Sequence, residues 1–173
     1  MRPLGLALLT GLAAATSCDP VHEDAKSALG PEAPDVHPGP THRPGQPCLV
    51  CHDGGFLDPP RFLIGGTVYA TPDANAPAVG ATVTLVGPDG ASTQLTTNSV
   101  GNFYAQETDY VPGFPLQVTV ESAGGLVVPM QTLVAGNGTV EANGACASCH
   151  VAPAGPASPG PVSLTLDDGG TPP

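Results

Sequence analysis

Only residues 61–141 show a regular alternation of apolar side chains, and this segment limits what the chain can fold into. The runs FLIGGTVYA, ATVTLVG and LQVTVES alternate with a period of two residues, which is typical of strands with one buried face. Turn sequences rich in Gly, Pro, Asn and Asp separate these runs. We count about six or seven short strands, so the pattern predicts an all-β fold, a small antiparallel β-sandwich.

Residues 65–105 resemble a known domain family. The stretch GGTVYATPDANAPAVGATVTLVGPDGASTQLTTNSVGNFYA has a G-x-V strand, a G-A-x-V-x-L strand, and a T-x-T strand that leads through a glycine turn into G-x-F. This order is similar to that of the carboxypeptidase regulatory-like domain. The resemblance implies a transthyretin-like, or more broadly Ig-like, β-sandwich. It implies nothing about activity, because such domains serve as supports or spacers in many exported proteins.

Two C-x-x-C-H motifs flank the predicted sandwich, CLVCH in residues 48–52 and CASCH in residues 146–150. With this spacing, two thiols can bond to the two vinyl groups of one porphyrin, and the adjacent histidine can ligate its iron. We therefore predict haem-attachment segments at residues 48–60 and 142–152, as in small exported dihaem c-type cytochromes, which the chain resembles. The predicted cofactors are two haem c groups, held by Cys48, Cys51, His52, Cys146, Cys149 and His150.

Other interpretations of the motifs stay open. Two C-x-x-C pairs can form a structural zinc site, a single pair can be a redox-active dithiol, and both pairs can close as disulfides. The pairs of a zinc ribbon usually have a short spacer, whereas here the whole predicted sandwich separates them. A thioredoxin-like dithiol needs a βαβ setting, which the sequence pattern does not offer. Haem is therefore the favoured interpretation.

Residues 1–18, MRPLGLALLTGLAAATSC, have the pattern of an export signal, with one basic residue, an apolar run and small residues before Cys18. The end of this segment resembles a bacterial lipoprotein signal, which implies that Cys18 becomes the lipidated first residue. An ordinary cleaved signal is the alternative. The cysteine count favours the lipoprotein, because one lipid and two haems account for all five thiols. We expect an exported, lipid-anchored protein of the bacterial cell envelope, in the periplasm or at the outer surface.

The chain is strongly acidic, with a formal net charge of −11. Once residues 1–18 are removed, only Lys26, Arg43 and Arg61 remain as fixed cations. Such a chain is not expected to bind nucleic acid or an anionic membrane surface by charge. We expect membrane attachment through lipid only, and redox proteins as partners.

Residues 19–47 and 153–173 are rich in Pro and Gly and have no apolar periodicity, so we expect an extended tether and a disordered tail. Within the tail, PVSLTL can add an edge strand. His42 lies six positions before Cys48 and is the candidate distal iron ligand, although a solvated linker histidine is an equally good interpretation. For His22 and His37 we favour the solvated interpretation, and for Met130 a core position.

The number of strands between the motifs decides their separation. An even number brings them to the same end of an antiparallel sandwich, whereas an odd number puts them about 20 Å apart. Just after the first motif, Phe56, Leu57, Phe62, Leu63 and Ile64 can pack on a porphyrin or begin the first strand.

The leading hypothesis is a dihaem electron carrier that is not an enzyme. A haem enzyme or gas sensor with a five-coordinate iron is a second class, but it calls for a distal acid or base, and the sequence points to none. The third class is a structural or binding surface lipoprotein with disulfide- or zinc-paired C-x-x-C motifs.

Overall fold

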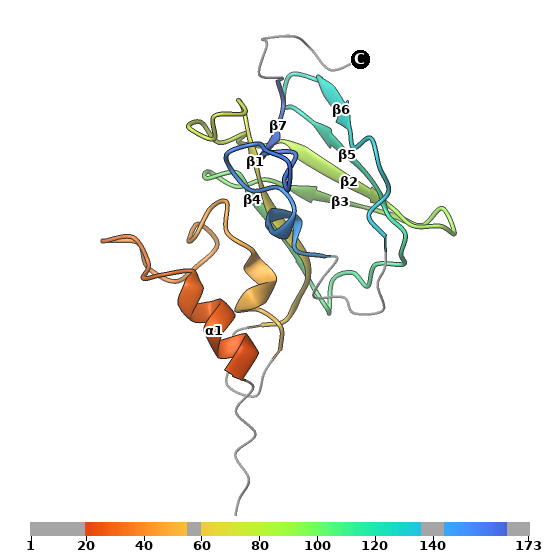
Figure 1. Ribbon diagram of the computed structural model, residues 1–173. Coiled ribbons are helices and arrows are strands. Elements are labelled where there is room, and N and C mark those ends of the chain that lie inside the picture. Colours follow the sequence, from red (N-terminus) through yellow and green to blue (C-terminus); the bar gives the residue numbers. More distant parts are fainter. Residues whose placement is uncertain (1–19, 55–59, 136–143, 166–173) are drawn as a thin grey trace, which may run out of the picture.

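The computed structural model describes residues 20–54, 60–135 and 144–165, and for residues 20–22 the backbone only. Two sheets pack face to face, which confirms the predicted all-β sandwich (Figure 1). One sheet has the order β4 (Asn102–Gln106), β1 (Phe62–Tyr69) and β7 (Val162–Ser163). The other has the order β3 (Ser92–Thr96), β2 (Thr82–Val86), β5 (Gln117–Glu121) and β6 (Val127–Pro129).

The antiparallel pairs follow the turn chemistry of the sequence. Strand β2 pairs with β3 from Thr82 opposite Thr96 to Val86 opposite Ser92, across the turn that contains Pro88–Gly90. The turn before β4 closes when the Asn98 N–H donates to the Asn102 carbonyl. Gly101 in this turn has φ +82° and lies against the Val68 carbonyl, so both the backbone conformation and the space favour glycine.

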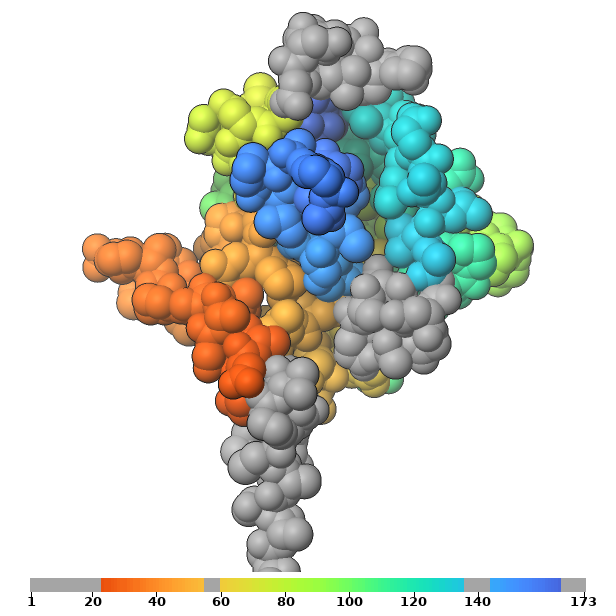
Figure 2. Space-filling model, viewed as in Figure 1, coloured from red at the N-terminus to blue at the C-terminus, as the bar shows by residue number. Residues whose placement is uncertain are grey.

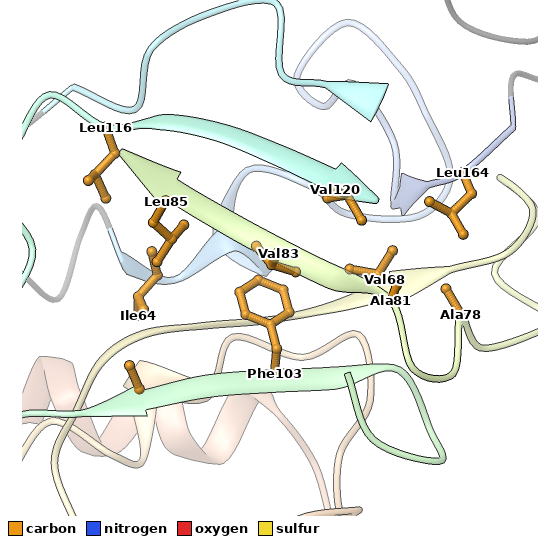
Figure 3. Close-up of a cluster of buried hydrophobic side chains, with 11 residues drawn as sticks. Ile64, Val68, Ala78, Ala81, Val83, Leu85, Phe103, Leu116, Val120 and Leu164 are labelled. Carbon is orange, nitrogen blue, oxygen red and sulfur yellow. The ribbon is translucent and has the colours of Figure 1, made fainter. Parts of the chain in front are cut away.

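The core lies between the two sheets (Figure 3). In β2 the predicted alternation is confirmed, because Val83 and Leu85 are fully buried while their neighbours are half-buried. The ring of Phe103 in β4 points from one sheet toward the other. Burial of such apolar area is the main driving force that holds the sheets together. The remaining core residues are Ile64, Val68, Ala78, Ala81, Ala105, Leu116, Val120 and Leu164.

Strand β1 differs from the simple alternating pattern, because its six central residues are all buried. The second sheet covers its inner face. The chain around the first motif covers the other face, where the Gly45 N–H donates to the Thr67 hydroxyl at 2.7 Å. A strand covered on both faces has no solvent side, which explains why Leu63 and Ile64 are both buried. Phe62 begins β1, as the second interpretation of this stretch expected.

The segment expected to be an extended tether has more structure than its composition indicates. It begins with α1 (Pro20–Ala28), which has an acidic residue in its first turn and Lys26 in its last, the arrangement that the helix dipole favours. The Arg43 side chain then binds the segment after α1, with Nη2 donating to the Gly30 carbonyl at 2.8 Å and Nε 3.2 Å from the Glu32 carboxylate. The segment therefore folds back on itself and lies against the sandwich.

The predicted edge strand in the tail is confirmed as β7, but it runs parallel to β1, with Val68 opposite Val162. The sandwich is therefore not purely antiparallel, and it includes residues beyond 141. No helix in the described ranges is long and apolar enough to span a membrane.

Candidate haem-attachment sites

Both C-x-x-C-H motifs adopt the same tight turn. The first three residues of each form a 3₁₀ helix, η1 (Cys48–Val50) and η2 (Cys146–Ser148). The N–H of His52 donates to the Cys48 carbonyl at 3.1 Å, and that of His150 donates to the Cys146 carbonyl at 2.9 Å. Each turn therefore brings its histidine back over its first cysteine.

Each motif histidine makes the same kind of hydrogen bond to a backbone carbonyl, and this bond fixes the tautomer of its ring. Nδ1 of His52 lies 3.0 Å from the Pro60 carbonyl, and Nδ1 of His150 lies 3.0 Å from the Gly160 carbonyl. A carbonyl oxygen can only accept, so Nδ1 carries the proton in both rings, and Nε2 has the lone pair. Metal-ligating histidines typically make this second-shell bond, which also raises their basicity. Both histidines are thus held in the form that binds iron.

The first motif faces a cavity of about 540 Å³, a volume typical of ligand pockets. Its lining includes Cys48, Cys51 and His52 of the motif together with His42 and Arg43. The His52 ring is buried and lies 3.9 Å from the Phe62 ring, centroid to centroid, with planes 4° apart. The thiols, the tautomer and the cavity therefore fit a haem attached through Cys48 and Cys51.

The structure brings the candidate distal ligand His42 next to His52. Their ring centroids are 5.8 Å apart and their planes differ by 13°. The rings are stacked, so the centroid distance places His42 beside His52 without showing that the two Nε2 atoms face each other. The solvated-linker interpretation does not describe this environment, since His42 is half-buried.

The hydrogen bond at His42 differs from those at the motif histidines. Its Nδ1 accepts the Gly39 N–H at 2.9 Å, so the neutral ring carries its proton on Nε2. For a neutral His42 to ligate iron through Nε2, the proton would have to move to Nδ1, which could then no longer accept the Gly39 N–H. His42 therefore lies near His52 but is held in the other tautomer.

Two polar side chains that the sequence analysis missed fix the backbone around His42. The buried Asn102 amide donates to the His42 carbonyl at 2.9 Å and accepts from the Thr67 hydroxyl at 2.7 Å. A buried asparagine at the start of a strand indicates a hydrogen-bonded partner, but sequence alone does not name a carbonyl 60 residues away.

The second motif has a smaller support. The Ser158 hydroxyl accepts the Val151 N–H at 2.9 Å and lies 2.8 Å from the Cys149 carbonyl, so it closes the loop that follows the motif. Cys149 is exposed. A second cavity, of about 560 Å³, lies between the loop after the motif and Pro72–Asp73, and its lining does not include Cys146, Cys149 or His150.

The first cysteine of each motif packs inward against β1. The Cys146 residue keeps some exposed surface, but its side chain packs on the core. Burial raises the pKa of the Cys146 thiol to about 12, with a further contribution from the charge of the nearby Cys48 thiolate. Burial likewise raises the pKa of Cys48 to about 11. Both thiols are therefore neutral at ordinary pH in the haem-free chain.

The other candidates lie elsewhere. His37 is exposed, as favoured. Met130 is half-buried, and its N–H donates to the Val118 carbonyl at 2.9 Å, which places it in the four-stranded sheet rather than beside β1. The side chain of His22 is outside the described part of the chain, as are Cys18, Phe56, Leu57 and the signal segment.

The four described cysteines are free thiols in this structure. No three His, Cys, Asp or Glu side chains of the described ranges are grouped to hold a metal ion, so the C-x-x-C pairs do not assemble the zinc cluster of the alternative interpretation here.

Comparisons with known proteins give no relative. No family model matches the chain, and neither a curated protein nor a solved structure matches it significantly. The similarity to carboxypeptidase regulatory-like domains and to dihaem cytochromes therefore stays a prediction from the sequence.

Proposed function

We propose that the chain is a lipid-anchored dihaem c-type cytochrome that passes electrons between redox partner proteins in the periplasm or at the cell surface. One observation carries the proposal. In both motifs, histidine Nδ1 lies 3.0 Å from a backbone carbonyl, so the same ligand tautomer is prepared twice. A structural role explains only that a buried ring nitrogen finds a partner, whereas haem ligation also explains why Nδ1 is the bonded nitrogen in both motifs.

The residues of the chain have separate tasks in this proposal. The cysteines hold each haem covalently, and His52 and His150 present Nε2 to the iron. The bound haem supplies an iron that takes up and releases single electrons, with a potential that the axial ligands and the surroundings tune. Around the first motif, Phe62 and the segment that carries His42 keep water away from the ligand ring.

The test is haem content after expression with a c-type maturation system. A pyridine haemochrome spectrum and the intact mass should give two covalent haems per chain. The matched control is the same chain expressed without the maturation system. A colourless chain from the maturing strain, four hydrogens lighter through two internal disulfides, would contradict the proposal and support a surface β module instead.

The lipid anchor is tested separately, because it depends on Cys18. We expect the matured protein to fractionate with membranes and the Cys18→Ser variant to be released, with both haems retained. Equal membrane association of both proteins would contradict the anchor while leaving the cytochrome proposal intact.

A further inference from the structure

The segment between α1 and η1 forms one wall of the cavity at the first motif. We call residues 30–47 the strap. Glu32, Pro40 and His42 of the strap line the cavity, as does Cys51 of the motif. Figure 2 shows the strap, in orange, on the outside of the sandwich. The position of the strap therefore limits access to the first motif.

Arg43 joins the two ends of the strap. Its Nη2 donates to the Gly30 carbonyl at 2.8 Å, and its Nε lies 3.2 Å from the Glu32 carboxylate. Its Nη1 donates to the side-chain oxygen of Gln46 at 2.7 Å and to the Leu29 carbonyl at 3.4 Å. Hydrogen bonds from a guanidinium are charge-assisted and are stronger than those between neutral groups. One side chain therefore holds the strap closed on itself.

The backbone at Arg43 is strained. Its φ is +50°, in the left-handed region that residues with a side chain rarely adopt. Such a conformation persists only where the surrounding contacts hold it, and it is typical of clamps and switch segments. Loss of the guanidinium contacts would let the backbone relax, so the strain favours an open strap.

Neutral hydrogen bonds join the strap to the sandwich. The Asn102 amide of β4 donates to the His42 carbonyl at 2.9 Å, and the Gly45 N–H donates to the Thr67 hydroxyl of β1 at 2.7 Å. At the second motif Cys149 is exposed, and no segment of the described ranges covers it in this way. The strap therefore distinguishes the first motif from the second.

We propose that the strap is a gate over the first motif and that Arg43 is its latch. When Arg43 holds both ends, the strap covers the cavity. When Arg43 releases them, the cavity opens while the sandwich stays folded. The gate belongs to the haem-free chain, whereas its consequence for haem attachment rests on the proposed function. The first motif must then receive its haem before the strap closes or while it is open, and the second motif has no such restriction.

The experiment follows alkylation of the reduced, folded, haem-free chain by iodoacetamide. Peptide mass mapping gives a rate for each cysteine, which is divided by the rate of the same cysteine in denaturant. Cys51 reports on the cavity, and the exposed Cys149 is the internal reference. We expect Arg43→Ala to raise the Cys51 rate about tenfold, because it removes charge-assisted contacts, and to leave Cys149 unchanged. An unchanged Cys51 rate, or a parental Cys51 as reactive as Cys149, would overturn the inference.

Arg61→Ala is the matched control. Arg61 is outside the strap, and its Nη1 lies 3.7 Å from the Glu107 carboxylate. This variant should keep the parental Cys51 rate, and an equal acceleration would refute the assignment of the latch to Arg43. Cys146 packs on the core and reports on global unfolding. If Cys146 accelerated together with Cys51, the whole chain would be opening, and the gate would be refuted.

A second measurement needs no variant. Under native conditions, hydrogen exchange at the Gly45 N–H, which is bonded to Thr67, should be faster than at the Val68 N–H, which donates to the Gly101 carbonyl. Equal exchange rates would show that the strap opens only when the sandwich unfolds, against the inference. A matured chain without haem would instead overturn the proposed function and leave the gate standing, so the two failures are distinguishable.

Discussion

The two motifs share one local geometry but have different surroundings. At the first motif, the histidine ring is buried and lies against Phe62, and the folded-back N-terminal segment covers the cavity. At the second motif, Cys149 is exposed and the support is a short loop held by Ser158. A five-residue motif therefore determines its turn, while the histidine tautomer and the burial depend on what the rest of the chain places around the motif. Burial tunes haem potentials, so we expect two unequal sites.

The largest expected effect is the loss of one haem when one cysteine pair is replaced. Chains with Cys48→Ala and Cys51→Ala, or with Cys146→Ala and Cys149→Ala, should each retain one covalent haem by intact mass and haemochrome spectrum. The retained haems should have different midpoint potentials, because His52 is buried whereas His150 is half-buried and Cys149 is exposed. Identical potentials would show that the two surroundings do not matter.

At alkaline pH, the two buried thiols of the haem-free chain should ionise at different pH values and lower the free energy of unfolding over different pH ranges. Their pKa values in the folded state, about 11 for Cys48 and about 12 for Cys146, exceed the ordinary value of 9.0. The folded state thus holds these protons more tightly than the unfolded state does. Their contribution to the free energy of unfolding is fully present below about pH 9 and is lost as the pH rises toward the pKa of the folded state. Each thiol should cost about 1.4 kcal/mol of unfolding free energy per pH unit in that window.

Denaturant unfolding at a series of pH values measures this slope. A Cys146→Ala chain should lose stability up to about pH 11. A Cys48→Ala chain should lose stability over a window that ends below about pH 12, because the pKa of Cys146 no longer has the contribution from Cys48. The matured protein serves as the control, because its thiols are consumed as thioethers. A slope that survives in the Cys48→Ala, Cys146→Ala double variant would assign the effect to other groups.

Substitution of the two glycines should affect the second motif more than the first. At Gly66 an added Cβ is 2.8 Å from the Cys146 Cβ and 3.2 Å from the Phe103 ring, whereas at Gly65 the nearest atom is 3.3 Å away. We expect Gly66→Ala to lower the unfolding free energy of the haem-free chain by about 1–3 kcal/mol, as overpacking does, and Gly65→Ala by less.

Thermal and denaturant unfolding compare these variants. Gly124→Ala is the matched control, because its added Cβ would meet nothing closer than 3.7 Å. If Gly65→Ala proved more harmful than Gly66→Ala, the close approach would be tighter at the first motif than at the second.

Loss of the Asn102 amide should disturb the first site alone. Asn102→Ala removes the bond to the His42 carbonyl and leaves the buried Thr67 hydroxyl without this acceptor, at a cost of about 1–3 kcal/mol. In the single-haem variant that keeps the first site, the absorbance spectrum and potential should shift. The variant that keeps the second site should have an unchanged absorbance spectrum. A spectral shift in that variant would contradict the conclusion that Asn102 supports only the first site.

Ser158→Ala is the corresponding change at the second site. The hydroxyl is half-buried, so its loss should cost about 1 kcal/mol and shift only the potential of the second haem. A shift in the potential of the first haem alone would contradict the assignment of Ser158 to the second site.

Sequence patterns predicted the sandwich, because it depends on local alternation. The strands β2 and β5 lie within runs recognised by their period of two. The docking of residues 40–46 was not predictable, since its acceptors are backbone carbonyls, which every residue has. The same limit applies to Pro60 and Gly160, whose carbonyls fix the histidine tautomers. The adjacent glycines in FLIGGTVYA did hold a signal, because glycine inside a strand often marks a close approach of backbone.

In the described ranges, six strands, β1 to β6, lie between the motifs. This even number agrees with the contacts that both motifs make with β1. The meeting point is nevertheless the middle of β1, not an end of the sandwich, because the chain before η2 runs alongside this strand.

The convergence of the chain on β1 has a consequence for the order of folding. Gly65 meets Ala145, Val68 meets Val162, and Thr67 meets Gly45, so β1 is completed only by closing long loops on both sides. Long-range contacts of this kind form slowly, whereas the β2–β3 hairpin is local. We expect the hairpin to form early in folding and both cysteine turns to settle late. The thiols would then stay accessible to the maturation machinery until the last stage of folding.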